Sequence, residues 1–200
     1  MGRLVPKKGL DILLRAMARP EAAATTLTLV GDGPEEAALR SLAAELKLGD
    51  RVTWLGALSN AEVRARMAEA GVFVLPCREA ADGDRDGIPV VLMEAMARRV
   101  CVVSGDLETI RELVSGNETG LMVPPGAVDE LAGALGRLAA DPALRIRLAE
   151  AGRARVADEF ALDVTLDRLE SAFAAASIPP PADAAAATTQ ERSAKGTRHA

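Results

Sequence analysis

The sequence predicts an α/β protein: an open parallel sheet of about six strands with helices on both faces, a Rossmann-like arrangement. Short β-branched or apolar runs alternate with longer runs of helical period, which is the pattern of a parallel sheet covered by helices. Turn and capping signals separate the two kinds of run. A length of 200 residues and a hydrophobic fraction of 49% fit one domain with a tail.

The expected strands are short and are separated by segments long enough for a helix. They cover residues 2–5, 27–30, 52–55, 72–75, 101–104 and 120–123. The expected helices cover residues 10–18, 35–48, 61–70, 89–97 and 109–113, followed by a helical region from residue 128 onward. Residues 1–176 therefore form one domain in this interpretation.

Local signals support these boundaries. Ser59 and Glu62 have the spacing of a capping box, in which two side chains satisfy backbone N–H groups of the first helical turn. Residues 31–34, Gly-Asp-Gly-Pro, predict a structural turn that leads into a helix. Asp141 and Pro142 are typical of the start of one further helix, and Asp163 of another.

Composition excludes several classes of function. A formal net charge of -5 provides no uniform positive field, so no nucleic-acid partner is expected. No apolar run approaches the roughly 18 residues of a membrane span, and no signal peptide precedes the domain, which predicts a cytoplasmic protein. Cys77 and Cys101 are expected to be free, buried thiols rather than metal ligands, and the single His199 excludes histidine catalysis. Residues 177–200 are rich in proline and alanine and predict a disordered tail.

The most informative stretch covers residues 82–97. We expect Asp86 in a loop, Pro89 at the first position of a helix and Glu94 in its second turn. Free N–H groups and the helix dipole attract phosphate, and carboxylates accept hydrogen bonds from hydroxyls. A sugar nucleotide carries both groups. Arg3 and Lys8 would reach the same crevice, although, taken alone, that pair is better explained as two surface cations beside a turn.

Five motifs in order resemble the C-terminal, donor-binding half of the GT-B fold in the GT4 (group 1) glycosyltransferases, over residues 1 to about 176. The motifs lie at residues 2–9, 29–34, 52–56, 86–97 and 110–125. The resemblance implies transfer of a hexosyl unit, with retention of configuration and without a metal. The donor would be a UDP-, GDP- or ADP-hexose, and the acceptor a glycan, a lipid or a small molecule.

The resemblance also implies roles for individual residues. Asp86 would contact the hydroxyls of the sugar and Glu94 the ribose, which makes them the expected catalytic pair. Arg3 and Lys8 would contact the phosphates. The remaining expected donor-binding residues are Trp54, Leu55 and Gly56 near the base, and Gly87, Ile88, Val90 and Val91 near phosphate and sugar.

The resemblance places the acceptor site in an N-terminal Rossmann-like domain of the same enzyme that these 200 residues lack. The chain alone is therefore expected to be inactive. The resemblance also allows a peripheral contact of the full enzyme with the inner face of the membrane.

The chain departs from the family pattern in three places. Asp86 is one methylene shorter than the usual glutamate, which leaves the donor preference open. Arg78 follows Pro76 and Cys77 where Pro-Ser is common. Residues 107–110 replace a glycine-rich loop, and they place Glu108 near the expected acceptor side.

The acids at 82, 84 and 86 match the opening of an EF-hand loop, but position 12 of that loop is Met93 instead of glutamate. Residues 31–33 lack the spacing of a dinucleotide fingerprint. A non-catalytic nucleotide-binding or regulatory α/β module is the alternative to a transferase.

Overall fold

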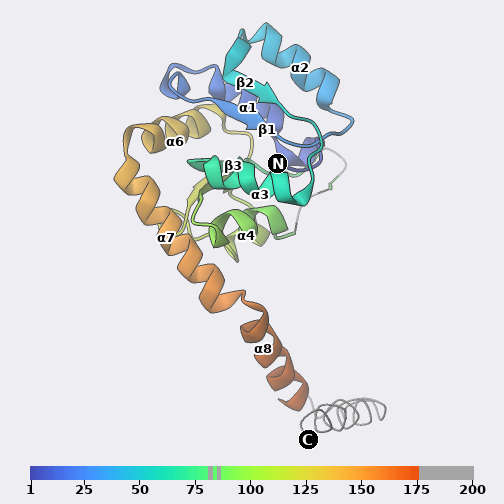
Figure 1. Ribbon diagram of the computed structural model, residues 1–200, viewed down its shortest axis with the longest axis vertical. Coiled ribbons are helices and arrows are strands. Elements are labelled where there is room, and N and C mark those ends of the chain that lie inside the picture. Colours follow the sequence, from blue (N-terminus) through green and yellow to red (C-terminus); the bar gives the residue numbers. More distant parts are fainter. Residues whose placement is uncertain (81–82, 85–86, 176–200) are drawn as a thin grey trace, which may run out of the picture. The chain divides into compact units, whose positions relative to one another are not determined.

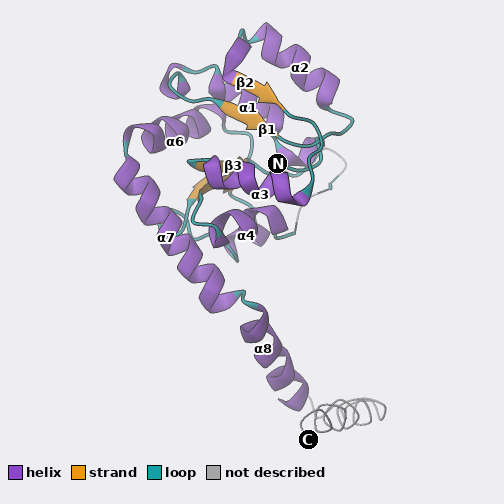
Figure 2. Ribbon diagram, viewed as in Figure 1, coloured by secondary structure: helices purple, strands orange, loops and turns teal. Residues whose placement is uncertain are grey.

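The structure is a computed structural model that describes residues 1–80, 83–84 and 87–175 (Figures 1 and 2). The chain divides into two compact units, residues 1–159 and 160–200. The strands of the first unit are β1 (Leu27–Leu29), β2 (Val52–Trp54), β3 (Val72–Leu75), β4 (Cys101–Gly105) and β5 (Leu121–Val123). Its α helices are α1 (Leu10–Met17), α2 (Glu36–Glu45), α3 (Asn60–Glu69), α4 (Val90–Ala97), α5 (Glu108–Arg111), α6 (Val128–Ala140) and α7 (Pro142–Glu159). Three short 3-10 helices complete it: η1 (Pro6–Lys8), η2 (Pro20–Ala22) and η3 (Gly49–Arg51).

The strands form two small parallel sheets, so the prediction of one six-stranded sheet is wrong. β1 pairs with β2 in one sheet, and β4 lies between β3 and β5 in the other. Residues 2–5, the first expected strand, are not part of either sheet. Their backbone runs beside residues 30–32, beyond the end of β1, and then turns into η1. Gly2 and Leu4 donate to residues 30 and 32, but residues 30–32 donate no backbone hydrogen bond back to this segment, so a regular parallel ladder does not form here.

Helices cover both faces of the three-stranded sheet, as predicted. Every residue of β4 is buried, which a strand achieves only when both faces of its sheet are covered. Cys101 and Val103 belong to the main apolar core together with residues from α1, α6 and α7. α4 packs against β4 and α7. Both cysteines are buried thiols outside any disulfide, and burial raises the pKa of the Cys101 thiol to about 11.

Most predicted helix boundaries hold within one or two residues. The capping box before α3 is present, because Ser59 accepts from the backbone of Glu62 and the Glu62 carboxylate accepts from the backbone of Ser59. These hydrogen bonds lower the pKa of Glu62. α7 begins at Pro142 as predicted. α2 ends three residues before the predicted 48, because Lys47 has a left-handed backbone with a φ of 54°.

Alanine substitutions at the two glycines of α6 are expected to change the stability of the first unit in opposite directions. A Cβ atom on Gly133 meets nothing within 4 Å, whereas one on Gly136 would lie 2.4 Å from the Glu21 carbonyl oxygen, where α6 packs on η2. Alanine favours a helix over glycine by about 1 kcal/mol, and overpacking costs about 1 to 3 kcal/mol. We expect Gly133→Ala to stabilise the first unit by about 1 kcal/mol and Gly136→Ala to destabilise it by a similar amount. Urea denaturation of both variants checks the sign, and equal signs would contradict the close approach.

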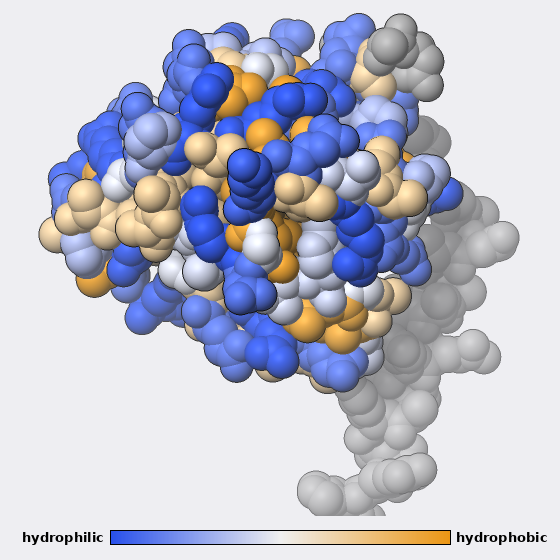
Figure 3. Space-filling model, turned by 90° about the horizontal axis from the view of Figure 1, so that it is seen from above, coloured by the Kyte–Doolittle hydropathy of each residue, from blue (hydrophilic) through white to orange (hydrophobic). Residues whose placement is uncertain are grey.

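The second unit contributes α8 (Leu162–Ala175). Four of its apolar side chains, Leu162, Leu166, Leu169 and Phe173, recur at helical spacing and are 47 to 75% exposed. The predicted tail, residues 177–200, lies outside the described residues. Within the described part of the chain, no helix combines the length and hydropathy needed to span a membrane. The face of the molecule seen in Figure 3 is mainly hydrophilic, with hydrophobic residues in small separate patches.

Candidate functional site

Residues 2–9, here called the basic segment, are held against the end of β1 by main-chain hydrogen bonds. The N–H groups of Gly2 and Leu4 donate to the carbonyl oxygens of Val30 and Asp32, at 2.9 and 2.7 Å. A Cβ on Gly31 would lie 1.9 Å from the Gly2 carbonyl oxygen, and one on Gly33 would lie 2.4 Å from that of Leu4. The turn at residues 31–34 is therefore structural, as predicted: its glycines let the basic segment approach.

The other side of the basic segment is held by the loop that follows β3. The backbone N–H of Arg78 donates to the Lys7 carbonyl at 2.9 Å, and its side-chain Nε donates to the Pro6 carbonyl at 3.1 Å. Lys7 Nζ lies 3.0 Å from the carboxylate oxygens of Asp84. The basic segment therefore lies between the ends of β1 and β3, which brings Arg3 and Lys8 to the edge where the strands end.

The ends of four strands meet at this edge. The N–H of Gly31 donates to the Gly56 carbonyl at 2.7 Å, which joins the end of β1 to the residues after β2. A Cβ on Gly105, at the end of β4, would lie 1.9 Å from the Cys77 carbonyl oxygen beyond β3. The order along the edge is thus β2, β1, the basic segment, β3 and β4. Parallel α/β sheets bind their ligands outside such carboxyl ends.

α4 begins four residues after Asp86 in the sequence and contains Glu94, the other expected carboxylate. Pro89 is its N-cap, and the helix begins at Val90, one residue later than predicted. Among the described residues, the N–H groups of Val90 and Val91 have no hydrogen-bond acceptor. These groups and the positive end of the helix dipole attract an anion. The side chain of Val90 is 68% exposed, which leaves the first turn open to a ligand.

Glu94 lies in the second turn of α4, as predicted. Its side chain is half-buried, and its carboxylate has no hydrogen-bond or ion-pair partner in the described part of the chain. Its carbonyl oxygen accepts from the Arg98 guanidinium at 3.1 Å. The carboxylate is therefore available to accept hydrogen bonds from ligand hydroxyls.

Other residues expected at the site lie just before α4 in the sequence. Gly87 is exposed, with open space around its Cα, and Ile88 is half-buried just before the helix. Asp86, the expected sugar contact, lies outside the described residues. So do Asp82 and Asp86 of the calcium-loop alternative. Over residues 1–80, 83–84 and 87–175, no three histidine, cysteine or acidic side chains gather as they would around a metal ion.

β2 ends at Trp54, and Leu55 and Gly56 follow it directly. The Trp54 ring is half-buried, and the guanidinium of Arg40 lies 4.6 Å from its centroid, a cation–π contact with α2. The N–H of Leu55 donates to the Leu29 carbonyl at 3.0 Å. Because Gly56 uses its carbonyl for Gly31, these residues have a structural role whatever their contact with a base.

The residues that hold the site together were not predicted from the sequence. Arg78 was noted only as a departure from the family pattern, yet it joins the β3 loop to the basic segment and to α1. Its Nη2 atom lies 3.0 Å from Asp11 Oδ1. Lys7 and Asp84 likewise pair across the loop. A cation just beyond a predicted strand was the available signal, but the side-chain partners of Arg78 are 67 to 72 residues away in the chain.

A further ion pair joins Asp106, just after β4, to α5. Arg111 donates to both carboxylate oxygens of Asp106, at 2.6 and 2.8 Å. These hydrogen bonds lower the pKa of Asp106 and raise that of Arg111. Glu108 is exposed at the first position of α5, beside this pair.

Together these features define an α/β domain with cations and a helix N-terminus at the carboxyl ends of its strands. The family model described as glycosyl transferases group 1 matches residues 1–155. The chain therefore belongs to the group 1 glycosyltransferases, as the motifs predicted.

Curated relatives are longer than this chain. The amylovoran biosynthesis glycosyltransferase AmsK of Erwinia amylovora is 38% identical over 162 residues, 80% of this chain and 40% of the relative. The GDP-mannose-dependent alpha-(1-6)-phosphatidylinositol monomannoside mannosyltransferase of Mycobacterium tuberculosis is 36% identical over 172 residues, 84% of this chain and 45% of the relative. The chain thus spans less than half the length of these two relatives.

Solved structures share the fold. The C-terminal domain of a group 1 glycosyl transferase (LpcC) from Francisella tularensis superposes with a TM-score of 0.71 at 19% identity, covering 81% of this chain and 84% of that domain. Anabaena Alr3699/HepE in complex with UDP has a TM-score of 0.72 at 26% identity, over 88% of this chain and 48% of that protein. The expectation of a GT-B C-terminal domain is confirmed.

Proposed function

We propose that this chain is the donor-binding half of a retaining glycosyltransferase that uses a UDP-, GDP- or ADP-hexose. The observation that carries the proposal is the juxtaposition at the strand ends. The basic segment is paired through Lys7 with Asp84 in the loop before α4, and the Glu94 carboxylate on α4 has no partner among the described residues. A nucleotide sugar offers a diphosphate to the cations and hydroxyls to the carboxylate. The complex of the Anabaena relative with UDP supports this ligand class.

In this proposal each group has one task. Arg3, Lys8 and the first N–H groups of α4 stabilise the negative charge that gathers on the diphosphate when its bond to the anomeric carbon breaks. Glu94 accepts from the ribose hydroxyls and Asp86 from those of the sugar. Protein cations and amides meet the charge of the leaving group, so the proposal includes no metal ion.

The acceptor site and the rest of the cleft belong, in this proposal, to an N-terminal Rossmann-like domain of the same enzyme. The acceptor is a glycan, a lipid or a small molecule. We further propose that the full enzyme is cytoplasmic and makes a peripheral contact with the inner face of the membrane.

A binding titration tests the proposal. Ligand-observed NMR with UDP, GDP, ADP and their hexose conjugates is expected to show binding of one nucleotide series. A hydrogen bond to a charged group contributes about 1.5 to 3 kcal/mol, so Glu94→Ala should weaken the nucleotide and its sugar conjugate alike, by about 10- to 100-fold. Asp86→Ala should weaken only the sugar conjugate.

Glu130→Ala is the matched control. Glu130 is an exposed glutamate in the first turn of α6, away from the strand ends, so its loss should leave every affinity unchanged. Binding of no nucleotide, or equal affinities for the Glu94→Ala and Glu130→Ala variants, would overturn the proposed site.

A further inference from the structure

Lys7 of the basic segment is held by the loop after β3 at both ends of the residue. Its carbonyl oxygen accepts from the N–H of Arg78 at 2.9 Å. Its side-chain Nζ lies 3.0 Å from each carboxylate oxygen of Asp84. One residue of the basic segment therefore binds this loop at Arg78 and again at Asp84.

The turn that carries Asp84 is closed by its own main chain. The N–H of Ala80 donates to the Asp84 carbonyl at 2.8 Å, and the N–H of Gly83 donates to the Ala80 carbonyl at 2.9 Å. Gly83 has a φ of 81°, a left-handed backbone that glycine adopts at no steric cost. Because these hydrogen bonds join Ala80 to Asp84, a contact at the Asp84 side chain limits the movement of both residues.

Lys7 and Lys8 are adjacent in η1 but face different partners. A 3-10 helix has 3.0 residues per turn, so successive side chains point about 120° apart. The side chain of Lys7 points to Asp84, which leaves Lys8 on another side of η1 for the phosphate that the proposed function assigns to it. The charges of Lys7 and Asp84 offset each other, so the pair adds little to the field that attracts a diphosphate.

The ion pair is too exposed to contribute much to the stability of the fold. The side chains of Lys7 and Asp84 are 23% and 57% exposed, and water and salt weaken the attraction of charges at such exposure. The basic segment is also joined to the loop by the Nε of Arg78, which donates to the Pro6 carbonyl. What the ion pair adds is a fixed position for the turn that precedes α4.

We propose that Lys7 and Asp84 form a positioning pair that prepares the loop before α4 for the hexose of the donor. The inference rests on the proposed function, in which Asp86 accepts from the hydroxyls of the sugar. Asp86 follows Asp84 by two residues in the sequence, and two residues of chain span at most about 7 Å. Holding Asp84 in advance lowers the conformational entropy that the loop loses when it binds the sugar.

The same division of tasks predicts which part of the donor depends on the pair. In the proposed function the diphosphate is bound by Arg3, Lys8 and the first N–H groups of α4. The sugar is bound by the loop that Asp84 holds. Loss of the ion pair should therefore weaken the contribution of the hexose to binding and leave that of the nucleotide.

The ratio of two affinities tests the proposal. Ligand-observed NMR gives the dissociation constants of UDP, GDP, ADP and their hexose conjugates for the unaltered chain and for Lys7→Met and Asp84→Asn. In each variant the hexose conjugate is expected to lose about fivefold in affinity relative to its nucleotide. The charge-reversed double variant, Lys7→Asp with Asp84→Lys, should recover at least half of that loss because it restores the ion pair.

Other roles of the two side chains give different results. If they acted only through their charge, Lys7→Met would weaken both ligands and Asp84→Asn would strengthen both, with the ratio unchanged. If they acted only on the fold, the urea midpoint and both affinities would fall together. Either result, or a double variant that recovers nothing, would overturn the positioning role.

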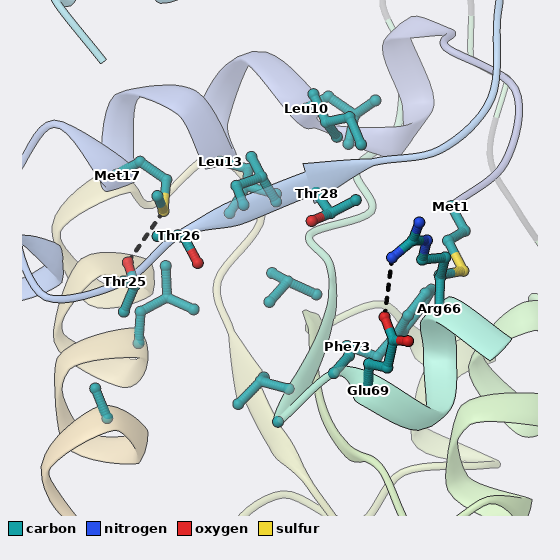
Figure 4. A pocket seen from close by; sticks show the side chains of 18 of the residues that line it. Met1, Leu10, Leu13, Met17, Thr25, Thr26, Thr28, Arg66, Glu69 and Phe73 are labelled. Carbon is teal, nitrogen blue, oxygen red and sulfur yellow. Dashed lines mark hydrogen bonds and ion pairs between the residues drawn. The ribbon is translucent and has the colours of Figure 1, made fainter. Parts of the chain in front are cut away.

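Arg66→Met is the matched control. Arg66 pairs with Glu69 at 3.1 Å, and both residues line a cavity of about 520 Å³ between β1 and β3 (Figure 4). This ion pair joins two residues of one helix, so its loss should leave the ratio unchanged. An unaltered chain that binds no nucleotide would overturn the proposed function and this inference with it. Equal affinities of the unaltered chain for a nucleotide and its hexose conjugate would overturn the positioning pair alone.

Discussion

Replacing Gly9 with alanine is expected to destabilise the first unit by about 4 kcal/mol and to abolish nucleotide binding. Gly9 has a φ of 63° between η1 and α1. A left-handed backbone costs a residue with a side chain about 1 to 2 kcal/mol. The larger part of the loss comes from contact, because the new Cβ would lie 2.1 Å from the Pro76 carbonyl oxygen. The basic segment would have to move away from the β3 loop.

Gly49→Ala is the matched control for Gly9→Ala. Gly49 has a φ of 50° and is the first residue of a short 3-10 helix, but a Cβ there meets nothing within 4 Å. It should therefore lose only the backbone contribution of about 1 to 2 kcal/mol and keep its nucleotide affinity. Urea denaturation and the NMR titration measure both quantities. Equal losses of stability in the two variants would show that the segment and the loop do not touch as described.

Replacing Arg78 with alanine is expected to cost about 2 to 3 kcal/mol of stability. The side chain donates to the Pro6 carbonyl and lies 3.0 Å from Asp11 Oδ1. That oxygen is buried and receives no hydrogen bond from the residues that the structure describes, so the guanidinium charge is what compensates it. Both side chains are more than a quarter exposed, which keeps the loss below that of a fully buried ion pair.

Two variants separate the contributions at Arg78. Arg78→Lys keeps the charge beside Asp11 but loses the rigid Nε donor, so it should recover about half of the loss. Arg66→Ala removes an arginine from an exposed pair with Glu69 on α3 and should cost less than about 0.5 kcal/mol. Thermal unfolding at fixed pH compares them. If Arg78→Ala is no worse than Arg66→Ala, the loop is not held by this side chain.

Local features of the sequence were sufficient to predict several helix starts, the alternation of strands with helices, and the family. The capping box at Ser59 and Glu62, the proline that opens α7 and the alternation of strands with helices all depend on residues close in the chain. Their physical causes act within one or two turns, so a sequence reports them directly. The five motifs, and with them the family, are likewise linear. Glu94 was placed correctly for the same reason, because its position follows from the start of one helix.

Only the tertiary structure decided which segments meet. Residues 2–5 have the composition of a strand, but their neighbours are residues 30–32, past the end of β1, and the sheet divides beside them. Arg78 acts through Pro6, Lys7 and Asp11, and Gly9 is required because the Pro76 carbonyl lies against it. Contacts of this kind join residues about 70 positions apart. They depend on where the whole chain places each strand end, which no local pattern of residues encodes.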